Sequence, residues 1–187
     1  PELVSMLRKD PGKYSYASSG NGGMIHLASY LFAKRAGGDA LHVPYRGSAP
    51  GMVDMIAGRH GFQIDTLQSS KGFIDGGKVR VIGVAADKRL PQLPDVPTID
   101  EAGLKGYEVT IWNGFFVPKG TPKDVITKLN QALVTALGDE KVRSRLIEQA
   151  VDLPTAAEAT PDALRNQLKA SIDKWVPAIK AAGVQPQ

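Results

Sequence analysis

Short apolar runs alternate with glycine-, serine- and proline-rich turns and with helical patterns over the first 110 residues, and this alternation limits the possible folds. Strands that alternate with helices along a chain are typical of an α/β fold with a parallel sheet. The run 79–86 is apolar almost throughout, which predicts a strand buried on both faces. The expected strands are 14–17, 41–44, 62–64 and 79–86, and the expected helices are 1–8, 24–36, 48–57 and 67–75.

The pattern changes beyond these elements. Three prolines fall between residues 91 and 97, where they exclude regular structure. One strand is then expected at 111–117, followed only by helical patterns. The chain therefore divides near residue 110, and a second part of this composition makes a poor independent core. We interpret residues 111–187 as part of a lobe whose other elements lie elsewhere.

Three helices are expected in this second part. The first opens at Thr121-Pro122, with Thr121 as the cap and Pro122 at the first helical position. The second runs from Asp139 through Gln149, and the third opens at residues 160–162. Pro177 is expected to kink or end the third helix.

Composition excludes several classes of site. The chain has no cysteine, so disulfides, thiolate metal sites and cysteine nucleophiles are absent. Its formal net charge is +4, with lysine and arginine scattered rather than gathered in the basic stripe of a nucleic-acid binder. This excess fits a mild general attraction for anions.

A loop of small residues joins the strand expected at 14–17 to the helix that starts at residue 24. Free backbone N–H groups and the positive end of the helix dipole favour a carboxylate or phosphate at such a place. Glycines let the backbone approach a ligand closely, and hydroxyl and amide side chains add donors. A glycine-rich turn that only leads into the helix is an equally weighted alternative. The candidate ligand-binding residues here are Ser18, Ser19, Asn21, Gly22 and Gly23.

Asp65 and Thr66 form a second candidate site. They follow the strand expected at 62–64, and ligands of α/β proteins bind at the carboxyl ends of strands. Asp65 could accept a hydrogen bond from a ligand ammonium or hydroxyl. It could equally cap the helix that follows.

The sequence lacks the motifs that are specific for nucleotide binding or for a catalytic serine. The glycine loop fits neither the dinucleotide fingerprint nor the phosphate-binding loop of nucleotide hydrolases, and no nucleophile elbow surrounds Ser18 or Ser19. The histidines His26, His42 and His60 lack metal-pair spacing. A Ser18–His42–Asp65 triad can be written, but most chains of this length allow such a triad. A serine hydrolase that uses the Ser18-Ser19 loop is therefore kept as the alternative function.

Several segments together resemble one protein family. They are HVPYRGSAP at 42–50, the LPDVPT-x-x-EAG pattern at 93–103 and the W-x-G-x-x-x-P-x-G-T-P pattern at 112–122. Together and in this order they resemble the Bug family, the extracytoplasmic solute receptors of tripartite tricarboxylate transporters. The resemblance covers essentially the whole chain.

The resemblance implies an α/β fold of the type II periplasmic-binding-protein kind. Residues 1–110 would be ligand-binding lobe two, residues 111–187 would be the C-terminal portion of lobe one, and an N-terminal third would be absent. The implied function is periplasmic capture of a small carboxylate, an organic acid or acidic amino acid, in an interlobe cleft. The implied partners are the membrane subunits of a transporter, with no enzymatic activity, cofactor, nucleic acid or membrane insertion. With one lobe's loop absent, we expect this chain alone to bind weakly.

The resemblance also carries over site residues. Ser18, Gly22 and Gly23 match the anion loop of lobe two, and Asp65 and Thr66 match a loop that contacts the rest of the ligand. Four positions depart from the family pattern: Asn21 where a small apolar residue is common, His60-Gly61 for Val-Asp, and Thr66 for asparagine. These departures leave the identity of the ligand open, more than its class.

Overall fold

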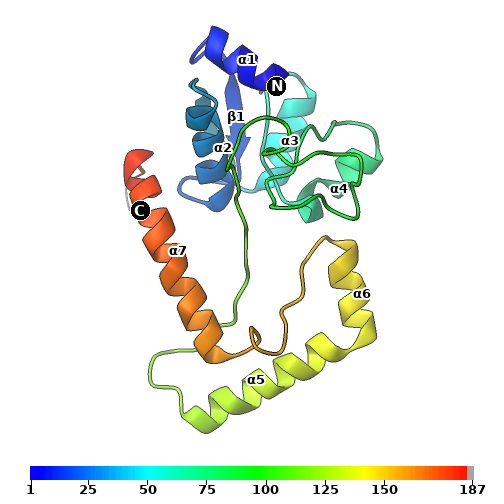
Figure 1. Cartoon of the computed structure of the whole chain (residues 1–187), viewed down its shortest axis with the longest axis vertical. Coiled ribbons are helices and arrows are strands. Elements are labelled where there is room, and N and C mark those ends of the chain that lie inside the picture. The colour runs from blue at the N-terminus through cyan, green and yellow to red at the C-terminus, as the bar shows by residue number, and fades with distance from the viewer. Residues whose placement is uncertain (185–187) are drawn as a thin grey trace. The chain divides into compact units, whose positions relative to one another are not determined.

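The chain divides into two compact units in a computed structural model that describes residues 1–184 (Figure 1). Unit 1 combines Pro1–Ile111 with the C-terminal segment that begins at Pro177, and unit 2 is Trp112–Val176. The elements of unit 1 are α1 (Glu2–Lys9), β1 (Ser15–Ser18), α2 (Met24–Arg35), β2 (Leu41–Pro44), α3 (Ser48–Ile56) and α4 (Leu67–Asp75).

Unit 1 is built on a parallel β–α–β unit. β1 pairs with β2 in a register that runs from Ser15 opposite Leu41 to Ser18 opposite Pro44. α2 connects the two strands, and both α2 and α3 pack against β1 (Figure 1). Parallel strands end at the same edge of a sheet, so the loops after β1 and β2 emerge side by side.

The core of unit 1 lies between α1, α2 and the segment that precedes unit 2. The hydroxyl of Tyr107 donates a 2.7 Å hydrogen bond to the carbonyl of Ala28 in α2, which fixes that segment on the helix. The buried cluster consists of Leu7, Tyr16, Phe32, Ala33, Ala36, Phe62, Leu104 and Tyr107. These residues bring together five stretches of the first 110 residues, as the predicted α/β arrangement requires.

Two expected strands of unit 1 are not formed. The segment 62–64 makes only an isolated bridge between Phe62 and Tyr16. The segment 79–86 was expected to be a strand buried on both faces, but only Val84 bridges, to Thr98, and Ile82 is 52% exposed. A strand is stable only beside neighbours that pair with its whole length, and here the neighbouring segments pair at single residues.

Unit 2 contains α5 (Lys123–Gly138), α6 (Glu140–Glu148) and most of α7 (Pro161–Ala181). The second expected helix forms, and Asp139, where it was expected to start, is the N-cap of α6 and accepts from the N–H groups of Lys141 and Val142. One expectation was wrong: Pro122 rather than Thr121 is the N-cap of α5. Pro177 was expected to kink or end α7, and it does not end the helix, which continues to Ala181. Proline inside a helix removes one hydrogen bond and its ring clashes with the carbonyl four residues earlier, and α7 continues in spite of this.

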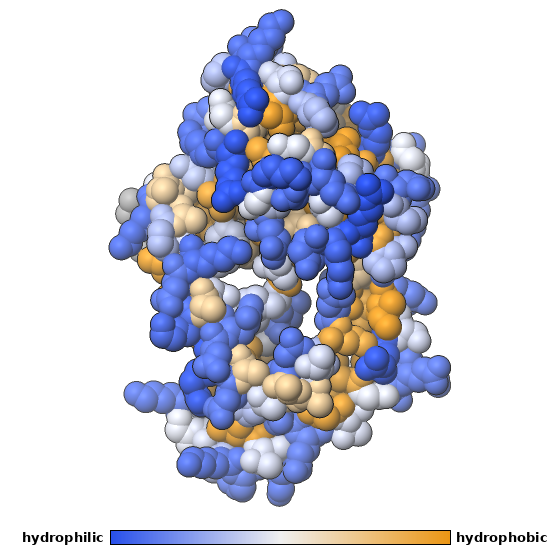
Figure 2. All heavy atoms as spheres, viewed as in Figure 1, coloured by the Kyte–Doolittle hydropathy of each residue, from blue (hydrophilic) through white to orange (hydrophobic). Residues whose placement is uncertain are grey.

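Unit 2 has no buried residue, although the structure describes all of residues 112–176. The strand expected at 111–117 is not formed, and Phe115 and Phe116 are 80% and 63% exposed. Apolar side chains of α5, α6 and α7 are exposed as well, and Figure 2 shows apolar residues at the surface. Unit 2 therefore lacks a core of its own.

Candidate functional site

Three loops at the carboxyl edge of the strands contact one another. They are loop 18–23 after β1, the loop after β2, and the turn before α4. The N–H of Tyr45 donates to the carbonyl of Ser18 at 3.0 Å, and the hydroxyl of Ser48 donates to the carboxylate of Asp65 at 2.9 Å. This edge of a parallel sheet is where α/β proteins bind ligands.

Ser18 is completely buried and holds the start of loop 18–23. Its Oγ accepts from the N–H of Gly20 at 3.2 Å and lies 3.0 Å from the carbonyl oxygen of the same residue. It also lies 2.6 Å from Nε2 of His42. Its hydroxyl therefore shapes the loop from inside instead of facing solvent.

Gly22 holds the far end of the loop. Its φ of +73° favours glycine, and a side chain at this position would meet Val184 at 3.1 Å. Its N–H donates to Nδ1 of His26 at 3.1 Å. The N–H groups of Gly20 and Gly22 are thus both used within the protein.

Other donors of the loop remain accessible. Ser19 is half-buried, while Asn21 and Gly23 are exposed. Gly23 is the N-cap of α2 and has no side chain to accept from the first N–H groups of the helix. Those N–H groups and the helix dipole together favour an anion.

The two histidines beneath the loop stack on each other. The rings of His26 and His42 are 3.7 Å apart between centroids and nearly parallel, at 6°. Burial lowers the pKa of both, and the neighbouring His26 adds to this effect at His42, whose pKa falls to about 4. Both rings are therefore neutral at pH 7. Among the described residues no cluster of side chains suits a metal ion.

Acid should destabilise unit 1 through this pair. Because the pKa of folded His42 lies below the value near 6.5 of an unfolded histidine, the unfolded chain binds a proton first as pH falls. The free energy of unfolding should be constant above pH 7 and fall between about pH 6.5 and 4, with His42 contributing at most about 1.4 kcal/mol per pH unit. Partial exposure of His42 makes the expected slope smaller than this limit.

Urea unfolding at a series of pH values measures this slope. His42→Gln should flatten it, and His60→Gln, outside the pair, should leave it unchanged. An identical slope in His42→Gln and the parent chain would contradict this account.

The side chains of Asp65 and Thr66, the second candidate site, are already engaged in hydrogen bonds within unit 1. Thr66, rather than Asp65, is the N-cap of α4, and its side chain accepts from the N–H of Ser69. The Asp65 carboxylate accepts from the side chains of Ser48, Gln63 and Ser69 and from the N–H of Thr66, at 2.8–2.9 Å. The sequence did not point to Gln63, two residues before Asp65, or to Ser48, whose contact with Asp65 depends on tertiary packing.

The Ser18–His42–Asp65 triad considered in the sequence analysis is not assembled in the structure. Ser18 contacts His42, but the carboxylate of Asp65 is bound by other groups and none of its hydrogen bonds goes to His42. Ser18 is also fully buried, so a substrate carbonyl could not reach its hydroxyl. A nucleophile needs an accessible oxygen and an oriented base, and this arrangement lacks both.

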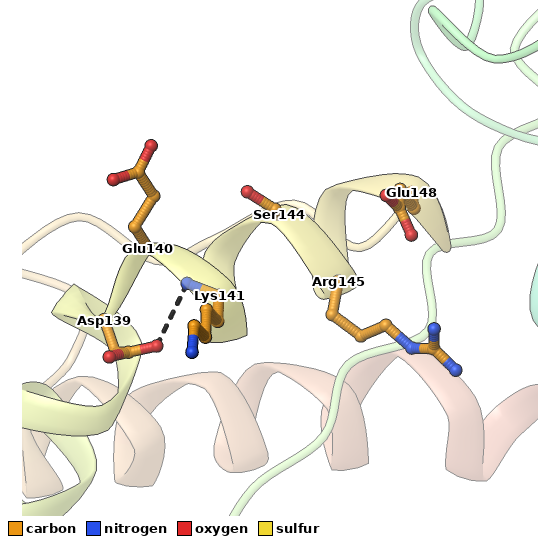
Figure 3. A pocket seen from close by; sticks show the side chains of 6 residues that line it. All are labelled: Asp139, Glu140, Lys141, Ser144, Arg145 and Glu148. Atoms are coloured by element: carbon orange, nitrogen blue, oxygen red, sulfur yellow. Dashed lines mark hydrogen bonds between the residues drawn. The ribbon is translucent and has the colours of Figure 1, made fainter.

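A surface hollow on α6 is a weaker candidate. The side chains around it come from one helix and its cap, and Figure 3 shows them diverging rather than converging on one point. Asp139 is already engaged in capping the helix. The residues around the hollow are Asp139, Glu140, Lys141, Ser144, Arg145 and Glu148.

The family assignment rests on nearly the whole described chain. Residues 1–184 match the family described as "Tripartite tricarboxylate transporter family receptor", TctC. The chain belongs to this family. This confirms the resemblance to Bug receptors, and it corrects the hydrolase alternative, because family members are receptors and not enzymes.

Relatives and solved structures agree with this TctC assignment. A Pseudomonas sp. (strain P51) protein of the UPF0065 group is 44% identical over 175 residues, covering 93% of this chain and 51% of the relative. An R. palustris protein solved with adipate has a TM-score of 0.89 and 34% identity, covering 100% of this chain and 61% of that chain. The periplasmic binding protein BugD has a TM-score of 0.87 and 37% identity, covering 100% and 62%.

This TctC chain is thus an α/β chain with part of the periplasmic-binding-protein fold. It spans about half the length of two of the curated relatives it matches, the one from Pseudomonas sp. (strain P51) and one from Agrobacterium vitis. No helix in the described part of the chain is both long and apolar enough to cross a membrane.

Proposed function

We propose that this chain is part of a periplasmic receptor that binds a small carboxylate, an organic acid or an acidic amino acid, for a tripartite transporter. The observation that carries the proposal is the N-terminus of α2, which has no side-chain cap and stands behind loop 18–23 at the carboxyl edge of the strands. The solved relative named with adipate supports the carboxylate class.

The proposed contacts follow from which donors are accessible. The carboxylate accepts from backbone N–H groups at Gly23 and the first turn of α2, and from the side chains of Ser19 and Asn21. Each hydrogen bond to a charged group is worth about 1.5–3 kcal/mol. Ser18 and Gly22 act indirectly, because they hold the loop in shape.

Asp65 and Thr66 are proposed to contact the remainder of the ligand. The carboxylate of Asp65 is oriented by four donors, so it offers an acceptor to a ligand hydroxyl or ammonium without a large loss of rotamer freedom. Thr66 has less to offer, since its hydroxyl already contacts Ser69.

The two units are proposed to belong to two lobes that close on the solute by a hinge motion. Residues 1–110 would form lobe two and residues 111–187 part of lobe one. The lack of buried residues in unit 2 supports the idea that its lobe contains further elements. Binding by this chain alone should therefore be weak.

A thermal-shift screen tests the proposal. It would compare di- and tricarboxylates, acidic amino acids, aromatic acids and neutral amides, on this chain and on a form extended at its N-terminus with the matching segment of a relative. A carboxylate at 100 times its dissociation constant adds about 2.7 kcal/mol, which is roughly 5–10 °C in melting temperature. If the extended form melts cooperatively and no acid shifts it, the carboxylate class is wrong.

A further inference from the structure

We infer that His26 and His42 are positioning residues: as a neutral, stacked pair they fix both ends of loop 18–23 and so aim its free N–H groups at the ligand. This inference rests on the function proposed above, and it assigns the pair no direct contact with the ligand. Neither histidine was among the candidate ligand-binding residues in the sequence, where His42 entered only the Ser18–His42–Asp65 triad.

Contacts run without a break from one end of the loop to the other. The start is held by His42, whose Nε2 lies 2.6 Å from Oγ of Ser18. His42 stacks on His26 with ring centroids 3.7 Å apart. The far end is held by His26, whose Nδ1 accepts from the N–H of Gly22 at 3.1 Å. The pair therefore links β1, β2 and α2 directly beneath the loop.

The contact with Gly22 defines the protonation state of His26. A backbone N–H can only donate, so Nδ1 of His26 must carry a lone pair and the proton must sit on Nε2. A protonated imidazole has donors at both nitrogens. Charged His26 is therefore incompatible with this position of Gly22, and the loop requires the neutral ring.

The surroundings of the pair keep it neutral. Tyr16 from β1 stacks against both rings, with centroid distances of 6.2 Å to His26 and 5.2 Å to His42. Asp39 and Tyr30 act on the Tyr16 phenol, and no carboxylate acts appreciably on either imidazole. The loop therefore binds the anion through uncharged N–H donors, and no imidazolium supplies an opposite charge.

Replacements that keep or remove a single acceptor test this role. In His26→Asn the amide oxygen can take the place of Nδ1 and accept from Gly22, and the side chain cannot be protonated. His26→Leu removes the acceptor. In the extended form, titrated with adipate in a calorimeter, His26→Asn should bind within about threefold of the parent, and His26→Leu at least about tenfold more weakly. If His26→Leu does not fold, His26→Gln replaces it, because its amide lies near the Nε2 position.

The pH profile separates positioning from a direct charge contact. Between pH 7 and 8.5 the affinity for adipate should stay constant in the parent, in His26→Asn and in the control His60→Gln. A fall in affinity as pH rises through this range would show that an imidazolium binds the carboxylate, and would overturn the inference. Equal affinity of His26→Leu and the parent would overturn it too.

Nuclear magnetic resonance (NMR) without ligand gives a reading that does not depend on the proposed function. Nitrogen shifts of the His26 ring should show an unprotonated Nδ1 and a protonated Nε2 at pH 7. The Gly22 amide resonance should move in His26→Leu and return toward its parent position in His26→Asn. If these signals behave so but no carboxylate binds, the proposed function fails and the positioning of the loop stands. A protonated Nδ1, or an unmoved Gly22 resonance, would overturn the inference itself.

Discussion

Replacing Gly38 with alanine is expected to lower the free energy of unfolding of unit 1 by about 3 kcal/mol. A methyl group there would lie 2.6 Å from the carbonyl carbon of Leu7 and closer still to its oxygen. Leu7 is fully buried, so the backbone of α1 cannot shift without disturbing the core. Urea unfolding followed by circular dichroism measures the loss.

Gly72→Ala is the matched control for this substitution. Gly72 lies within α4, and no atom comes within 4 Å of the added methyl group. Alanine is favoured over glycine in a helix by about 1 kcal/mol, so this variant should be unchanged or slightly stabilised. Equal stability of Gly38→Ala and Gly72→Ala would show that α1 does not pack against Gly38 as described.

The second large effect concerns Asp65. Asp65→Ala should cost about 3 kcal/mol, because four hydrogen bonds to one carboxylate are lost together and their donors are left without that partner. These donors come from α3, from α4 and from the chain just before and just after Asp65. The loss would therefore loosen the packing of α3 and α4 as well as the candidate site. Thermal unfolding without ligand measures it.

Asp65→Asn separates the carboxylate charge from the hydrogen bonds. The amide oxygen can still accept from Ser48, Ser69 and the N–H of Thr66, and the buried Oε1 of Gln63, which has no partner, can turn to accept from the new amide group. We expect a loss below about 1 kcal/mol. Equal stability of Asp65→Ala and Asp65→Asn would contradict this prediction, because it would show that the hydrogen bonds of Asp65 contribute little to the stability of the fold.

The same two variants also distinguish the loss of a ligand contact from an indirect effect of a disturbed fold on binding. Weaker binding in Asp65→Ala is evidence for a ligand contact only if Asp65→Asn, with an intact fold, loses affinity too.

Sequence patterns predicted the helices and strands whose formation depends mainly on nearby residues. Strands β1 and β2 and helices α2, α3 and α4 lie where apolar periodicity and glycine stops placed them, with boundaries shifted by at most a residue or two. The strands expected at 79–86 and 111–117 are absent, because a strand needs a partner along its length and the sequence of one segment does not reveal its neighbours.

The same limit applies to the candidate site. The small residues of loop 18–23 are adjacent in sequence, so their arrangement before α2 could be predicted. The stacking of His26 on His42 could not, since it arises only when α2 packs beside β2. Of the four donors around Asp65, only Ser48 comes from a distant element, α3, whereas Gln63, Thr66 and Ser69 lie within four residues of Asp65. In both cases at least one contact that shapes the site is tertiary and is not visible in a local pattern.

The most direct test of the central claim is an NMR titration of the ¹⁵N-labelled extended form with adipate, with adipamide as the uncharged control. The account predicts that adipate shifts the amide resonances of loop 18–23 and the first turn of α2 most strongly, that α6 is unaffected, and that adipamide has little effect. Saturable adipate shifts confined to other parts of the chain would contradict it, as would equal responses to adipate and adipamide.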